Sequence, residues 1–214
     1  YFMKKLYYFI AGTISRLIDI ISVWRYDIVF IHREAYPIGG PYMEKILSVL
    51  NKPIIFDFDD AIFLPSSSGR NKFIEYLKRP CRTKKIIKYS SCVIAGNDYL
   101  AEFASKFNNN VQVIPTSIDT VRYTPKRKTC SEDIVIGWIG STTTSDFIKI
   151  MQGVIIKLSK KYDNLVLKVI GGDFSVSGLS NIVSKPWSLE KEMEDINTFD
   201  IGIMPMSDNG WTRG

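Results

Sequence analysis

Residues 91–114, with the sequence SCVIAGNDYLAEFASKFNNNVQVI, contain a complete strand–helix–strand pattern. Ser91–Ala95 is a short apolar run, typical of a strand buried on both faces of a parallel sheet. Asn97 or Asp98 can cap the helix that follows, and Val111–Ile114 is a second buried strand. This order predicts a parallel βαβ unit within a doubly wound α/β sheet.

The same alternation precedes this unit. Phe2–Ser22 has helical apolar spacing with a wide stripe, which predicts a helix facing the core; a helix on a membrane surface is the alternative. The other elements predicted here are strands at Tyr26–Ile31 and Pro53–Asp57 and helices at Pro41–Leu50, Lys72–Lys78 and Thr83–Tyr89.

A polar, basic stretch at residues 118–132 interrupts the alternation. It contains Pro125 and the basic residues that follow, Lys126, Arg127 and Lys128, and this composition favours a linker. A second alternation then follows, with strands at 134–139, 165–170, 182–183 and 199–204 and helices at 144–161 and 189–196. We therefore expect two tandem Rossmann-like domains, both incomplete, at residues 1–117 and 133–214.

The bulk composition leaves many functions open. The formal charge of +6 favours anionic partners, although lysines on a solvated surface give the same balance, and we expect no nucleic-acid partner. Three cysteines without a CxxC pair and a single histidine argue against a zinc site and favour a reducing, cytoplasmic compartment. Arg16 and Asp19 interrupt the N-terminal apolar run, so neither a signal peptide nor a membrane span is predicted.

Ligands of parallel α/β sheets bind beyond the carboxyl ends of the strands, and polar residues lie there in the first array. His32, Arg33 and Glu34 end the first strand, where they can bind a sugar hydroxyl or a phosphate, or act as a base. The alternative is a solvated loop with an internal ion pair. Gly40 belongs to a Gly-Gly-Pro helix start that follows.

Three carboxylates, Asp57, Asp59 and Asp60, end the second strand. Such a cluster can hold Mg²⁺ or supply a nucleophile and an acid, and it resembles the Asp-x-Asp-x-Thr motif of haloacid-dehalogenase-like phosphatases. Ala61 occupies the threonine position of that motif. A structural role, with Asp60 capping a short helix, is the third interpretation.

The second array has its own candidates at strand ends. Gly140, Ser141 and Thr142 form a small-residue turn whose backbone N–H groups are expected to cradle a diphosphate. Trp187 can stack on a base, with core packing as the alternative. The remaining candidates on this side are Gly171, Gly172, Asp173, Pro205 and Asp208.

Together these stretches resemble bacterial glycosyltransferases of family 4. The likeness rests on the order and spacing of motifs that cover nearly the whole chain: 93–100, 113–119, 123–125, the Gly-Trp-Ile-Gly-Ser turn at 137–141, and 199–205. Tyr36–Phe63 resembles a subgroup whose acceptor domain carries Arg-Glu, a Gly-Pro helix start and an Asp-x-Asp-Asp-Ala strand end.

The resemblance implies a GT-B fold with the reaction between an acceptor-side and a donor-side domain. It implies transfer from a nucleotide-sugar donor to a polysaccharide or lipid-linked acceptor, with retention at the anomeric carbon and without an essential metal or other cofactor. The basic surface and the first helix would suit peripheral contact with an anionic inner membrane. A non-catalytic nucleotide-sugar-binding protein is a further alternative.

The chain also departs from the family. The family's first strand and glycine-rich loop are not present before Tyr1, and its donor-site lysine and Glu-x₇-Glu segment would follow Gly214. We therefore expect a fragment that is inactive by itself. The candidate catalytic residues are His32 and Asp57; the acceptor-side residues are Arg33, Glu34, Gly40, Asp59 and Asp60; Arg213 joins the donor-side residues.

Overall fold

A computed structural model of the chain describes residues 2–36, 39–64, 81–126, 132–142, 144–172, 174–175 and 181–214. The predicted helix at Lys72–Lys78, the linker residues 127–131 and the candidate residue Asp173 lie outside these ranges. The chain divides into two compact units. Unit 1 is Tyr1–Thr116 with Asn209–Gly214, and unit 2 is Ser117–Asp208.

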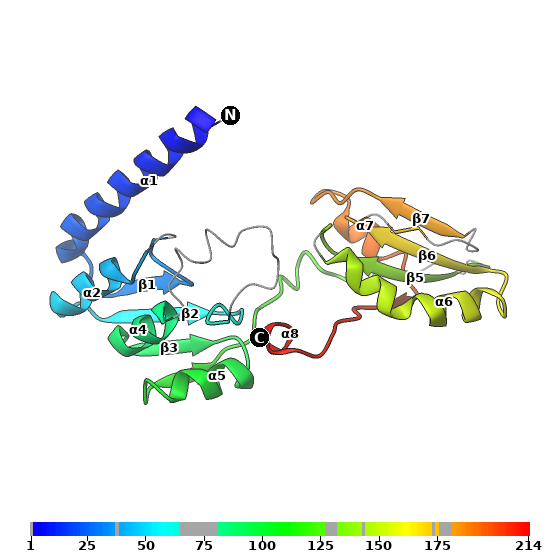
Figure 1. Cartoon of the computed structure of the whole chain (residues 1–214). Helices are drawn as coiled ribbons and strands as arrows, with labels where there is room; N and C mark the ends of the chain where they lie inside the picture. The colour runs from blue at the N-terminus through cyan, green and yellow to red at the C-terminus, as the bar shows by residue number, and fades with distance from the viewer. Residues whose placement is uncertain are drawn as a thin grey trace. The chain divides into compact units, whose positions relative to one another are not determined.

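Unit 1 is built on a parallel four-stranded sheet with the order β1-β2-β3-β4 (Figure 1). Its strands follow one another in space as they do in sequence, so β1 and β4 are the edges. The elements are α1 (Phe2–Ser22), η1 (Val23–Arg25), β1 (Val29–His32), α2 (Tyr42–Val49), β2 (Ile54–Phe58), α4 (Arg82–Tyr89), β3 (Cys92–Ala95), α5 (Asp98–Ser105), β4 (Val111–Val113) and the C-terminal α8 (Gly210–Arg213).

Alternate side chains along each strand of unit 1 point to opposite faces of the sheet, and this alternation separates the core residues from the polar residues at the strand ends. Ile31, Phe56 and Val93 are register partners on neighbouring strands, and all three are buried. The next row along the sheet holds His32, Asp57 and Ile94, whose side chains point to the opposite face. One face therefore forms the core with α2, α4 and α5, and the other carries the polar strand ends.

The apolar stripe of α1 is exposed, so the prediction of a core-facing helix is wrong. Met3, Ile14 and Ile21 are 72%, 52% and 74% exposed, and α1 extends away from the sheet in Figure 1. The reason is that β1 is an edge strand, and no further strand of the described chain pairs with it to receive the stripe. The Thr13 hydroxyl of α1 lies 2.9 Å from the Tyr36 hydroxyl.

Unit 2 is built on a second parallel four-stranded sheet with the order β7-β6-β5-β8. The strand order reverses at β5, and in doubly wound sheets a ligand crevice forms at the carboxyl ends of strands at such a point. The elements are β5 (Ile134–Ile139), η3 (Ser145–Met151), α6 (Gln152–Ser159), β6 (Leu165–Ile170), β7 (Ile182–Lys185), α7 (Glu192–Ile196) and β8 (Ile201–Gly202).

Three elements of unit 2 differ from the prediction. The helix expected at 144–161 begins as the 3-10 helix η3 before it becomes α6. The helix expected at 189–196 is only α7, and the strand expected at 199–204 pairs only at β8. The described part of the predicted linker, residues 118–126, belongs to unit 2. None of the described helices is both long and apolar enough to cross a membrane.

Candidate functional site

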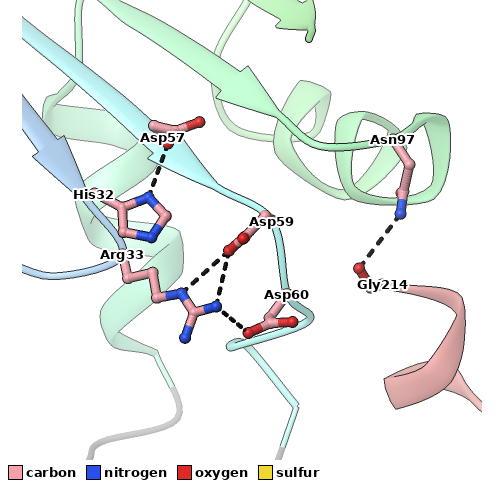
Figure 2. Close-up of polar contacts among 7 residues, drawn as sticks. All are labelled: His32, Arg33, Asp57, Asp59, Asp60, Asn97 and Gly214. Atoms are coloured by element: carbon pink, nitrogen blue, oxygen red, sulfur yellow. Dashed lines mark hydrogen bonds and ion pairs between the residues drawn. The ribbon is translucent and has the colours of Figure 1, made fainter. Parts of the chain in front are cut away.

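His32 and Asp57 form a hydrogen-bonded pair where β1 and β2 end (Figure 2). They are register partners, and His32 Nδ1 lies 2.8 Å from Asp57 Oδ2. The side chains are 51% and 25% exposed. If the imidazole is neutral, the Nδ1 proton is donated to the carboxylate and the Nε2 lone pair remains available. This is the arrangement of a general base that a carboxylate orients.

Arg33 is held beside this pair in a backbone conformation that is rare for a residue with a side chain. Its φ is 62°, in the left-handed region, and such outliers concentrate at functional sites. The guanidinium donates from Nε to Asp59 Oδ1 at 3.1 Å and also pairs with Asp60 (Figure 2). Asp60 therefore does not cap a short helix, as one interpretation proposed; the chain forms a turn there.

Two buried charged residues hold the loop that follows β1. Glu44 on α2 is fully buried and accepts a hydrogen bond from the backbone N–H of Ala35 at 3.1 Å. Arg82 on α4 is also buried; it pairs with Glu34 at 3.2 Å and donates to the backbone carbonyl of Tyr36. Glu34 thus pairs with a residue far along the chain rather than within its own loop, and sequence reasoning missed both anchors.

Asn97 links α5 to the end of the chain. Its side-chain oxygen accepts from the Leu100 N–H at 2.9 Å, which confirms the predicted helix cap. Its amide nitrogen donates to the backbone carbonyl of Arg213 at 3.2 Å. It also donates to the backbone carbonyl of Gly214 at 3.4 Å, the bond drawn in Figure 2. Arg213 therefore lies in unit 1, whereas the other predicted donor-side residues lie in unit 2.

The predicted acceptor-side residues come together except for Gly40. The pairs formed by His32 and by Arg33 lie on the adjacent ends of β1 and β2. Gly40 is buried under the ring of Tyr42 at the start of α2, so its role here is packing. Among the described residues, no group of three or more His, Cys, Asp or Glu side chains is arranged to hold a metal ion.

Glycines at the strand ends of unit 2 allow close packing around Trp138. A Cβ on Gly140 would lie 2.5 Å from the buried indole, and one on Gly172 would lie 3.0 Å from it. Gly171 has a φ of +82°, and a Cβ there would lie 2.1 Å from the Gly140 carbonyl oxygen. The loops after β5 and β6 are therefore in contact. Glycine is required at these positions because a side chain would overlap neighbouring atoms.

Two of the backbone N–H groups that were expected to bind a diphosphate after β5 form hydrogen bonds within the protein. The Gly140 N–H donates to the Ile170 carbonyl at 3.0 Å, and the Ser141 N–H donates to Thr144 Oγ1 at 3.1 Å. These two N–H groups therefore form bonds within the protein, and diphosphate binding by this turn stays a prediction. Ser141 and Thr142 remain exposed at this edge.

Trp187 follows β7 on the same edge and is 47% exposed, so it is not a core residue. A Cβ on Gly171 would lie 3.1 Å from Trp187 Cβ, which places the tryptophan beside the glycine loops. Its indole N–H donates to Glu192 at 3.3 Å. Pro205 and Asp208 follow β8, the other strand beside the reversal point at β5.

A buried ion pair in unit 2 was not foreseen from the sequence. Lys168 on β6 donates to Asp195 on α7 at 2.6 Å, and both side chains are less than 10% exposed. Burial opposes ionisation of Asp195, but the hydrogen bond and charge of Lys168, aided by Lys185, outweigh it and lower the pKa of the carboxyl. This pair fastens α7 to the sheet.

Comparison with solved structures assigns the fold. The chain is similar to a UDP-forming α,α-trehalose-phosphate synthase from Burkholderia xenovorans, with 10% identity and a TM-score of 0.62. The match covers 92% of this chain and 58% of that one, so the chain spans little more than half of its relative. A co-structure of S. aureus MnaA with UDP also matches, with 14% identity and a TM-score of 0.48 over 88% of this chain and 55% of that one.

The predicted fold class is therefore confirmed: two α/β units with parallel sheets, as in GT-B glycosyltransferases. No family model and no curated protein sequence matches the chain. Membership of glycosyltransferase family 4 stays a prediction.

Proposed function

We propose that this chain belongs to an enzyme that transfers a sugar from a nucleotide-sugar donor to a polysaccharide or lipid-linked acceptor. The observation that carries the proposal is the His32–Asp57 pair at the carboxyl edge of a GT-B-type acceptor-side unit. His32 Nε2 would accept a hydrogen bond from the acceptor hydroxyl, while Asp57 fixes the imidazole tautomer. The donor would bind at unit 2, beside Gly140, Gly171 and Trp187.

The stereochemical course has two candidates. The family resemblance favours retention, in which His32 orients the acceptor hydroxyl and the departing phosphate takes its proton. The pair itself favours inversion: the acceptor oxygen attacks C1 from the face opposite the nucleotide, the C1–O bond to phosphate breaks, and His32 takes the proton. The anomeric configuration of the product, read by NMR, distinguishes them.

The test is sugar transfer by the full-length protein with a panel of nucleotide sugars and glycan acceptors. We expect activity in EDTA, because no metal is proposed to take part, and a fall in kcat of about 10²-fold or more in His32→Ala. The exposed control Glu102→Gln should be unaffected. Residues 1–214 alone should be inactive. Full activity in His32→Ala would contradict the assigned role, and transfer itself would exclude a protein that only binds nucleotide sugars.

A phosphatase is the alternative that rests on Asp57 and Asp59. Their carboxylates bind different side chains, His32 and Arg33, rather than facing one common site, which favours transfer. Magnesium-dependent hydrolysis of p-nitrophenyl phosphate that is lost in Asp57→Asn would reverse this preference.

We further propose that α1 lies on an anionic membrane surface, which would make the protein cytoplasmic and peripheral. The helix exposes an apolar stripe, and the chain is basic. The stripe consists of Met3, Ile10, Ile14, Leu17, Ile18 and Ile21.

Co-sedimentation with phosphatidylglycerol–phosphatidylcholine vesicles tests this contact. Ile14→Glu, on the stripe, should abolish binding, whereas Ser15→Glu changes the charge of the next, exposed position and should only weaken it. Wild-type protein that remains in the supernatant, or two variants that bind equally, would contradict the proposal.

A further inference from the structure

One carboxylate in unit 2, Glu192, collects hydrogen bonds from two separate segments. Its Oε1 accepts from the Trp187 indole N–H at 3.3 Å. Its Oε2 accepts from Arg122 Nη2 at 3.1 Å and from the Tyr123 hydroxyl at 2.8 Å. The carboxylate is 16% exposed, so water competes little for these bonds, and charge-assisted bonds of this kind are about twice as strong as neutral ones.

The segment that supplies two of these donors is ordered by its own contacts. Asp119 Oδ1 accepts from the N–H groups of Val121 at 3.0 Å and Arg122 at 3.1 Å, and its carbonyl accepts from the Tyr123 N–H at 2.8 Å. Arg122 also donates to the carbonyl of Leu189 at 2.8 Å. The turn therefore presents Arg122 and Tyr123 together to the loop that carries Trp187.

Trp187 gains its orientation from this network. Its Cβ packs beside Gly171, but 47% of the residue is exposed, and its indole N–H donates to Glu192. Without that bond the indole would be free to change rotamer. An aromatic ring can bind a nucleobase only if its face is held open to it, and such stacking contributes about 1–3 kcal/mol per base.

We propose that Glu192 is a positioning residue that couples the Asp119–Tyr123 turn to nucleobase binding by Trp187. The inference rests on the proposed donor side of unit 2. Thermodynamic coupling is reciprocal, so any partner or motion that displaces the turn changes nucleotide affinity, and bound nucleotide holds the turn in place.

The experiment is calorimetric titration of the full-length protein with UDP, GDP and ADP. Trp187→Ala should weaken binding of the best ligand by about 5–150-fold, from the stacking energy. Glu192→Ala should weaken it by about 10-fold and Tyr123→Phe by about 3-fold, although neither residue is proposed to touch the ligand. Glu194→Ala, an exposed neighbour on the same helix, is the matched control and should bind normally.

A double-mutant cycle separates positioning from general damage. Once Trp187 is alanine, Glu192→Ala should cost almost nothing further, because the ring that it orients is gone. An additional loss equal to that in the wild-type background would overturn the inference.

The hydrogen bond between Tyr123 and Glu192 can also be tested without a ligand, through the pKa of the Tyr123 hydroxyl. The hydrogen bond that it donates to Glu192 raises the pKa of its hydroxyl. Glu192→Gln should lower that pKa, measured by NMR of tyrosine labelled at Cζ. An unchanged Tyr123 pKa in Glu192→Gln, together with an unchanged nucleotide affinity in Glu192→Ala, would overturn this inference but not the proposed donor side. Wild-type protein that binds no nucleoside diphosphate would overturn both the inference and the proposed donor side.

Discussion

The carboxyl edges of the two sheets are built in opposite ways. In unit 1 the strand ends carry charged groups that pair with one another across β1 and β2. In unit 2 the strand ends carry glycines packed against Trp138, and the ion pair Lys168–Asp195 is buried between β6 and α7. A charged edge can orient a hydroxyl or move a proton, whereas the glycines of unit 2 let the loops after β5 and β6 pack closely around Trp138.

We expect the largest loss of stability from adding a side chain to a glycine at the strand ends of unit 2. Gly171→Ala places a Cβ against the Gly140 carbonyl and forces a positive φ on alanine, so we expect unit 2 to lose about 4 kcal/mol or more of unfolding free energy. Gly153→Ala is the control, because a Cβ there meets no atom within 4 Å and α6 should gain about 0.5–1 kcal/mol. Urea unfolding gives both values, and equal effects would refute the steric argument.

The next effect concerns the buried charge of unit 2. Asp195→Asn leaves Lys168 buried with Lys185 as a second cation nearby, and should cost about 3 kcal/mol. Because folding lowers the pKa of Asp195, the wild-type advantage is present above the ordinary carboxyl pKa of 3.8 and is lost as pH falls through the lower folded value. Chemical unfolding from pH 7 to pH 3 should show the two proteins converge; a constant difference would exclude this role.

The smallest effect separates two functions of Asn97 in unit 1. Asn97→Ala should cost about 1 kcal/mol through loss of the α5 cap. Asn97→Asp keeps the cap acceptor but removes the donors to Arg213 and Gly214, so it should preserve α5 while it increases hydrogen exchange in residues 209–214. Equal exchange in the wild type and Asn97→Asp would show that the amide does not hold this segment.

Local pattern was sufficient for most of the fold. Short apolar runs identified all eight strands found in the described residues, although the last is shorter than predicted. The Asn97 cap was predictable because capping depends on residues within one turn. Whether the apolar stripe of α1 is buried or exposed was not predictable, because the stripe does not specify what covers it. The stripe that predicted a core helix is exposed beside an edge strand.

The candidate site was predictable only where strand ends define it. His32 and Asp57 could be chosen because parallel strands bring their carboxyl ends to one edge. Glu44, Arg82 and Glu192 were missed, since each acts through partners that only the tertiary fold brings near. Glu192 and Arg122 are 70 residues apart in sequence, and no spacing rule joins them.

The assignment of Asn209–Gly214 to unit 1 has a consequence for how the protein is made. Unit 1 is discontinuous, so a ribosome must synthesise all of unit 2 before the last six residues of unit 1 emerge. The bonds from Asn97 to Arg213 and Gly214 span 116 and 117 positions, and contacts of such separation form late because they close the longest loops. The nascent first unit must therefore persist on the ribosome with that part of its strand-end surface uncovered until residues 209–214 have been synthesised.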